Sequence, residues 1–121
     1  MTNLPLDIIN MKTIAEAKAL MNDRFPMMVK YFLEDMQMYL EEIEKGVQTK
    51  NVEMAISPAH TIKSSAKQLG VDRVSVIAKD IEELCRNLVD NGGEGFAKFE
   101  ALHRQLKKEV DIATPELNKL C

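Results

Sequence analysis

An apolar stripe at helical spacing along residues 24–49 constrains the fold of this chain more than any other feature. Seven apolar residues there follow one another at steps of three or four, namely Phe25, Val29, Phe32, Met36, Leu40, Ile43 and Val47. Such steps return to one face of an α-helix, whereas a half-buried strand would turn an apolar residue inward at every second position. The stripe therefore predicts one long helix with a single buried face.

The segment before the long helix predicts a short helix of its own. Thr13 and Glu16 have the spacing of a capping box, in which the hydroxyl and the carboxylate each bond a free backbone N–H group. We therefore expect this helix to open at Thr13. Residues 22–23 (Asn-Asp) interrupt it, and Pro26 suits the first turn of the next helix because that turn does not use its N–H groups.

A third helix is expected to end at Gly70, because glycine suits the position just after a helix C-terminus. Its start has two interpretations. Either Asn51 caps a longer helix that kinks at Pro58, or Ser57 caps a shorter helix with Pro58 as its first residue. We favour the longer, kinked helix.

Two further helices follow. The fourth is predicted from about 72 to 90, capped by Asp72 and closed by residues 91–93 (Asn-Gly-Gly), and the fifth from about 95 to 111. Residues 114–115 (Thr-Pro) resemble the N-cap and first position of a short tail helix. Both helices carry apolar stripes, formed by Val74, Ile77, Ala78, Ile81, Cys85 and Leu88 in the fourth and by Phe96, Phe99, Leu106 and Val110 in the fifth.

Together these segments predict an all-α protein. Amphipathic helices joined by short turns favour an antiparallel up-down four-helix bundle, here with an additional short N-terminal helix packed across one end. A chain of 121 residues is long enough for one hydrophobic core. We expect a single domain over residues 1–121, with its core at about 13–111 and with extensions at 1–12 and 112–121.

Composition and charge exclude several classes of function. The formal net charge of −3 argues against nucleic-acid binding through phosphate contacts. No apolar run reaches the ~18 residues of a membrane-spanning helix, and the N-terminus lacks the order of a secretory signal, so we expect a cytoplasmic protein. Cys85 and Cys121 form neither a disulfide framework nor a metal-binding pattern, and we expect Cys85 to be a buried thiol. Because the two histidines do not form Glu-x-x-His pairs on facing helices, as a metal-binding bundle requires, we expect no metal or cofactor.

The segment 59–70 carries the residues suited to chemistry. Placed on a helix at ~100° per residue, its apolar side chains share one face, formed by Ala59, Ile62, Ala66 and Leu69. The other side takes the polar residues spaced i, i+3, i+4 and i+7, which are His60, Lys63, Ser64 and Lys67. We therefore expect His60 to be solvent-accessible near the middle of the bundle. His103 falls on the apolar face of the fifth helix and is expected to be a more buried packing residue.

An exposed histidine of this kind suits phosphoryl transfer. A neutral imidazole nitrogen is a good nucleophile and can attack an acyl phosphate. Lys63 and Lys67 are positioned to stabilise the phosphoryl oxygens, and the small side chains of Ser64 and Ser65 leave room for a partner protein. On spacing alone, a surface histidine beside solvated lysines fits equally well.

The second imidazole nitrogen needs a hydrogen-bond acceptor that fixes the tautomer. Glu82, beside the apolar stripe of the fourth helix, is our candidate and is expected within hydrogen-bond reach of His60, directly or through one water. Arg86, one turn later, is either its ion-pair partner or a further phosphate ligand. An ordinary surface pair at i, i+4 is the alternative interpretation of Glu82 and Arg86.

The segment His60-Thr61-Ile62-Lys63-Ser64-Ser65-Ala66, followed by Gly70, resembles the signature of histidine-containing phosphotransfer (HPt) domains. That signature has a lysine three residues after the histidine, usually a glycine four after it and a glycine ten after it. The resemblance covers roughly residues 20–107, and includes Phe32-Leu33-Glu34-Asp35 and Ile81-Glu82-Glu83-Leu84-Cys85-Arg86. The family has Gln or Glu 22 residues after the histidine, which is Glu82 here, and Ser64 departs from the usual glycine.

This resemblance implies a phosphohistidine intermediate of a multistep phosphorelay, which accepts a phosphoryl group from a receiver-domain aspartate and passes it to another receiver domain through His60. It implies receiver domains of response regulators and a hybrid sensor histidine kinase as partners, and a monomeric phosphocarrier without ATP-dependent kinase activity. Mg²⁺ is then expected only in the partner receiver domain. We expect Ser64, Ser65 and Gln68 to contact that partner.

Two rival functions were weighed against phosphoryl transfer. A kinase dimerisation domain is disfavoured because Thr61, and not an acidic residue, follows His60, and because the chain has no Gly-rich nucleotide segment. A non-phosphorylated helical adaptor that binds response regulators or other signalling proteins stays open. Met27, Tyr31 and Met38 lie off the main stripe of the long helix, and form either a docking surface or inter-helix packing.

Overall fold

The computed structural model describes residues 4–121, which form helices joined by short turns. Two single 3₁₀ turns, η1 and η2, accompany five α-helices. The elements in chain order are α1 (Met11–Met21), η1 (Asn22–Arg24), α2 (Phe25–Gln48), η2 (Val52–Ala55), α3 (Ile56–Gln68), α4 (Asp72–Asn91) and α5 (Phe96–Asn118). No strand occurs among the described residues, which confirms the prediction of an all-α protein.

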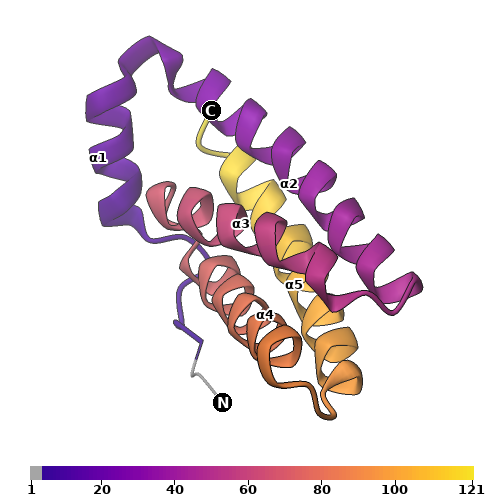
Figure 1. Cartoon of the computed structure of the whole chain (residues 1–121). Coiled ribbons are helices and arrows are strands. Elements are labelled where there is room, and N and C mark those ends of the chain that lie inside the picture. The colour runs from indigo at the N-terminus through magenta and orange to yellow at the C-terminus, as the bar shows by residue number, and fades with distance from the viewer. Residues whose placement is uncertain (1–3) are drawn as a thin grey trace.

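Helices α2 to α5 form an antiparallel bundle (Figure 1). Helix α3 packs most extensively against α4, α4 packs on α5, and α2 contacts both α3 and α5. Helix α1 lies across the end of the bundle where α2 begins and α3 ends (Figure 1). The up-down four-helix bundle with an additional N-terminal helix is thereby confirmed.

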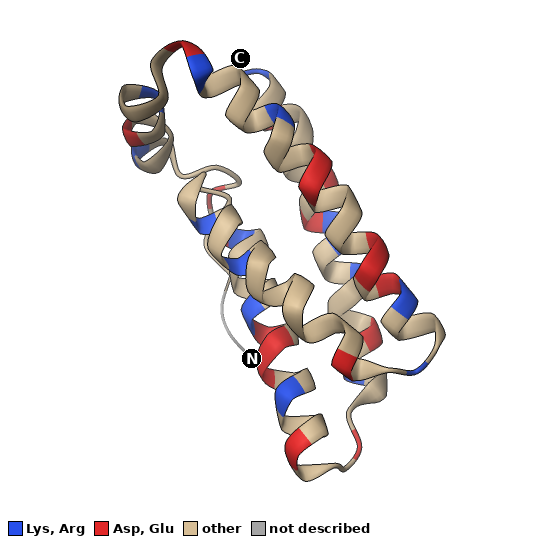
Figure 2. Cartoon of the chain, turned by 45° about the horizontal axis from the view of Figure 1, so that its top comes forward, with Lys and Arg blue, Asp and Glu red and all other residues tan. Residues whose placement is uncertain are grey.

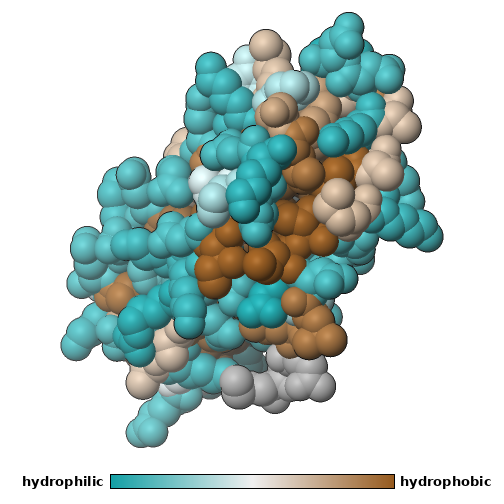
Figure 3. All heavy atoms as spheres, turned by 180° about the vertical axis from the view of Figure 1, so that it is seen from behind, coloured by the Kyte–Doolittle hydropathy of each residue, from teal (hydrophilic) through white to brown (hydrophobic). Residues whose placement is uncertain are grey.

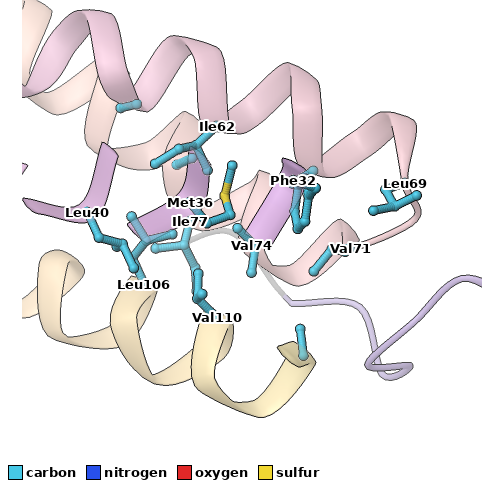
Figure 4. Packing of buried hydrophobic residues seen from close by; sticks show 14 of the residues in the cluster. Phe32, Met36, Leu40, Ile62, Leu69, Val71, Val74, Ile77, Leu106 and Val110 are labelled. Atoms are coloured by element: carbon cyan, nitrogen blue, oxygen red, sulfur yellow. The ribbon is translucent and has the colours of Figure 1, made fainter. Parts of the chain in front are cut away.

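The core lies between the apolar stripes that the sequence predicts (Figure 4). All the stripe residues of α2 are buried except Val47, which packs partly exposed against the core. From the other helices, Ile62, Ile77 and Leu106 are fully buried and meet Met36 of α2 near the bundle axis. Burying one Leu- or Ile-sized side chain contributes about 1.5–3 kcal/mol, so the stripes rather than the individual helix ends determine the fold.

Two helix starts differ from the expectations, and Asn10 explains both. Helix α1 begins at Met11 and not at Thr13, because the side chain of Asn10 accepts the Thr13 N–H at 3.2 Å and serves as the N-cap. Asp72 is the first residue of α4 and not its cap, which is Val71. The Asp72 carboxylate accepts instead from the Asn10 side-chain amide at 3.1 Å.

The start of α3 lies close to the longer of the two alternatives. Helical structure begins at Val52, directly after Asn51, as the 3₁₀ turn η2, and changes to an α-helix between residues 55 and 56 rather than at Pro58. Pro58 is the third residue of α3, where a backbone N–H has no partner within the helix. Its missing N–H group therefore costs nothing there.

The prediction of a separate tail helix at residues 114–115 is wrong. Helix α5 runs through Pro115 to Asn118, so that residues 112–118 belong to the bundle and not to an extension. The buried side chains of Ala113 and Leu117 hold this last stretch against the core. The Thr114 hydroxyl does not cap a new helix, and donates to the Val110 carbonyl one turn earlier at 2.8 Å.

One face of the molecule combines a mainly hydrophilic surface with an apolar area (Figure 3). Seen from behind the view of Figure 1, it shows an apolar patch surrounded by polar side chains (Figure 3). Within residues 4–121, none of the helices combines the length and the apolar character that crossing a membrane requires.

The turn between α3 and α4 is fixed by Gly70, which occupies the predicted position after the helix end. Its φ is +76°, a conformation that favours glycine, and its carbonyl accepts the Asn10 N–H at 2.8 Å. A Cβ atom added at Gly70 would lie 2.8 Å from the Asn10 carbonyl oxygen. The N-terminal segment can therefore pack against the end of α3 because residue 70 is a glycine. A side chain at this position would collide with Asn10.

We predict that Gly70→Ala lowers the free energy of unfolding by more than the ~1–2 kcal/mol of a left-handed residue, because the added methyl group also meets Asn10. Gly93→Ala is the control, since Gly93 also has a positive φ, of +100°, but no atom within 4 Å of the added Cβ. Urea denaturation measures both variants. Equal losses of stability would show that the Asn10 contact is unimportant.

Candidate functional site

Helix α3 presents His60 to solvent in a basic setting. The side chain of His60 is 55% exposed, while its neighbours Ala59 and Ile62 are buried and fix the orientation of the helix. The charged residues of α3 are lysines alone, whereas acidic residues outnumber basic ones on α2 (Figure 2). The expected exposure of His60 is confirmed.

Glu82 of α4 holds one nitrogen of His60. The distance from His60 Nδ1 to Glu82 Oε2 is 2.9 Å, so the predicted hydrogen bond across 22 residues is present without a water. The carboxylate is shared with two cations. Lys63 Nζ donates to Oε1 at 2.7 Å, and Arg86 donates to Oε2 from Nε at 3.0 Å and from Nη2 at 2.8 Å.

The side chain of Glu82 is only 7% exposed, yet its carboxyl group is held in the ionised form. Burial alone would raise the pKa of Glu82, but the hydrogen bonds from Lys63, Arg86 and His60 outweigh burial and lower that pKa to about 2. An ionised carboxylate only accepts hydrogen bonds. In the neutral form of His60, Nδ1 must therefore carry the proton, which leaves Nε2 with a free lone pair on an exposed side chain.

Close approach of α3 and α4 brings these groups together. Buried alanines from both helices, Ala59 and Ala66 in α3 and Ala78 in α4, leave little side-chain bulk between the two backbones. Ser75 adds a cross-link, because its hydroxyl donates to the Lys63 carbonyl at 2.8 Å. Ser75 is not among the residues predicted from the sequence, where its signal is a small polar residue beside the apolar stripe of α4.

The other predicted site residues lie outside the Glu82 cluster. Lys67 is exposed and lines a hollow between α3 and α4 together with Lys63 and Ser64. Ser65 and Gln68 face the opposite way. They line an apolar groove of about 360 Å³ beside α2, which is also lined by Met27, Met28, Tyr31, Phe32 and Asp35.

The second histidine has a different environment. His103 of α5 is buried, with 8% of its surface exposed, and burial is the main cause that lowers its pKa. This agrees with the packing role expected from its place on the apolar face. Within residues 4–121, no group of three or more His, Cys, Asp or Glu side chains has a geometry that could hold a metal ion.

A second ion pair was not predicted. Arg73 of α4 donates from Nε and Nη2 to the Glu109 carboxylate of α5 at 2.8 and 2.7 Å, and from Nη1 to the Pro5 carbonyl at 2.8 Å. This fork-shaped contact ties the N-terminal segment to two helices of the bundle. It involves none of the residues around His60.

Comparisons with known proteins identify the family of this chain. The Hpt domain family model matches residues 27–112. The phosphorelay intermediate protein rdeA of Dictyostelium discoideum is 26% identical over 80 residues, which is 66% of this chain and 29% of that protein. The chain thus spans less than a third of that relative's length.

A solved structure gives the same picture of the fold. The crystal structure of histidine-containing phosphotransfer protein B (HptB) from Pseudomonas aeruginosa PAO1 superposes with a TM-score of 0.84, covers 95% of both chains and is 18% identical. At that identity the similarity shows a common fold.

We predict that Glu82 makes folding stability depend on pH in acid. The pKa of Glu82 is lowered from 4.5 to about 2 in the folded protein, so its contribution is present above pH 4.5 and is lost as the pH falls towards 2. The whole loss amounts to about 3 kcal/mol, of which about 2 kcal/mol falls between pH 5 and pH 3. Urea unfolding of wild-type protein and Glu82→Gln at pH 5 and pH 3 measures it, and the variant should lose less stability between these values. An equal loss in both proteins would contradict the prediction.

Proposed function

The chain belongs to the Hpt domain family, and we propose that it is a phosphohistidine intermediate of a multistep phosphorelay, with His60 as the phosphoryl acceptor. One observation carries this proposal. An exposed imidazole has its Nδ1 proton held by an ionised, buried carboxylate, which leaves Nε2 as the nucleophile.

In the proposed reaction, the Nε2 lone pair attacks the phosphorus atom of an aspartyl phosphate in a receiver domain. The bond between phosphorus and the aspartate oxygen breaks, and the carboxylate leaves with the bonding electrons. No proton has to move, because Nδ1 already carries one and donates it to Glu82 as a hydrogen bond. The reverse reaction delivers the phosphoryl group to a second receiver domain.

Lys63 is the proposed stabiliser of the phosphoryl oxygens. It lies one turn after His60, and its ammonium group is held beside the histidine by Glu82 Oε1. Arg86, held by the same carboxylate and exposed at its tip, is a secondary ligand in this proposal. Lys67 lies one turn further along α3 and contributes charge at longer range.

The docking surface proposed for the receiver domain has two parts beside His60. Ser64 lies in the hollow with the lysines, and Ser65 and Gln68 lie in the groove next to α2. Met27 and Tyr31, about half exposed, extend this groove outward. Exposed apolar side chains next to a groove are typical of a protein interface.

We further propose that residues 1–121 act as one monomeric domain in the cytoplasm, with response-regulator receiver domains and a hybrid sensor histidine kinase as partners. The receiver domain supplies Mg²⁺ and its own catalytic groups, and this chain acts as a carrier without ATP-dependent activity. Labelling of the isolated chain by ATP would contradict that assignment.

We predict that His60→Gln abolishes acceptance of label from a phosphorylated receiver domain and leaves the fold intact, because an exposed side chain contributes little packing. His103→Gln is the control and should still accept label. Transfer of radioactive phosphate, with circular dichroism as a check of folding, measures both. Label on the His60→Gln protein would exclude His60 as the acceptor, and a wild-type protein that accepts no label would favour the non-phosphorylated adaptor.

We predict that Lys63→Ala slows transfer without abolishing it, since the lysine supplies charge and not the nucleophile. Loss of one stabilising group in a desolvated site costs ~2–4 kcal/mol, and because this surface is open we expect a loss at or below the lower end of that range. Lys67→Ala should have a smaller effect. Single-turnover transfer from a phosphorylated receiver measures both rates, and a larger effect of Lys67→Ala would reverse the assignment of the two lysines.

A further inference from the structure

Glu82 accepts the hydrogen bond from Nδ1 of His60 through a charged carboxylate, and this charge affects the His60 ring once it is phosphorylated. Glu82 receives donors from His60, Lys63 and Arg86, and its side chain is almost fully buried. A glutamine in this place would have the same size and one acceptor oxygen. It would differ in carrying an NH₂ group, which can donate a hydrogen bond to a ring nitrogen that carries no proton.

Phosphorylation of Nε2 makes the proton on Nδ1 decisive. With that proton, the ring is a phosphoimidazolium, and breaking the bond between phosphorus and Nε2 returns the bonding electrons to a neutral imidazole. Without it, the leaving group is an imidazolate, which is a far poorer one. The phosphoryl group is therefore transferable mainly in the protonated form.

We propose that the negative charge of Glu82 keeps the proton on Nδ1 of phosphorylated His60 and thereby maintains the phosphohistidine in its transferable form. The inference rests on His60 being the phosphorylated residue, as in the proposed function. Glu82 acts here as a positioning residue. A carboxylate 2.9 Å from Nδ1 stabilises the charged ring and offers no proton to an uncharged one.

The other charged groups around the ring fit this role. Lys63 lies on the same helix, and Arg86 on α4 donates to the same carboxylate. Glu53 of η2 lines a hollow with Arg86, and Asp35 of α2 faces the groove on the other side of α3. Glu82 is thus the carboxylate in hydrogen-bond contact with the histidine.

The test uses the full chain phosphorylated chemically with phosphoramidate, with His60→Gln to identify the His60 signal. ³¹P NMR follows hydrolysis from pH 6 to pH 10, and ¹⁵N NMR of labelled histidine reports the proton on Nδ1. In wild type, the rate of hydrolysis should fall as the pH rises and Nδ1 loses its proton, and the pH at half of this fall is the midpoint. In Glu82→Gln, we expect this midpoint to lie about one pH unit or more lower. At pH values between the two midpoints, the hydrolysis rate of Glu82→Gln should fall by about tenfold per pH unit.

Two further variants separate charge from structure. Glu82→Asp keeps the charge and should move the midpoint back towards the wild-type value. Glu109→Gln makes the same chemical change at another buried, ion-paired glutamate that does not contact His60, and should leave the midpoint unchanged. An unchanged midpoint in Glu82→Gln, including a uniform slowing at every pH, would overturn the inference.

These outcomes are independent of transfer between proteins. If receiver domains fail to phosphorylate His60 but the midpoint still shifts, the proposed relay function fails and the inference about Glu82 stands. If receiver domains transfer normally and the midpoint does not shift, the inference fails alone.

Discussion

The arrangement of the site depends on one buried carboxylate. Removing a carboxylate from water costs several kcal/mol unless charged partners and hydrogen bonds offset the loss, and Glu82 obtains three donors from two helices. The same bonds that stabilise the charge also join α4 to α3 and set the orientation of His60. The charge of Glu82, the packing of α3 on α4 and the orientation of the His60 ring therefore cannot be varied independently.

The core and the turns supply the precision that this cluster needs. Helices α3 and α4 approach closely over buried alanines, and Ser75 cross-links them one turn away from His60. Gly70 lets the N-terminal segment close the end of α3, while Arg73 anchors that segment to Glu109 and α5. The exposed imidazole of His60 thus rests on a closely packed support, which preserves the orientation of its ring.

Most of the helices could be predicted because their apolar stripes are long and regular, as along α2. The errors fall at helix ends. Asn10, which is held by Gly70 and Asp72, caps α1 in place of Thr13, and burial of Leu117 carries α5 through Pro115. The contact between His60 and Glu82 could be predicted from motif spacing and helix adjacency. The sharing of that carboxylate by Lys63, and the contact of Ser75, depend on side-chain directions that a one-dimensional pattern does not contain.

Charge is distributed unequally between α2 and α3. Lysines of α3 lie on the helix that carries His60, while acidic residues predominate along α2 (Figure 2). Fields of this kind act over roughly a Debye length, about 8 Å at physiological ionic strength, and they turn an approaching protein before any surfaces touch. A partner whose phosphorylated centre is anionic would be drawn preferentially to the α3 side. Raising the salt concentration would then lower the rate of association without altering the geometry of the bound complex.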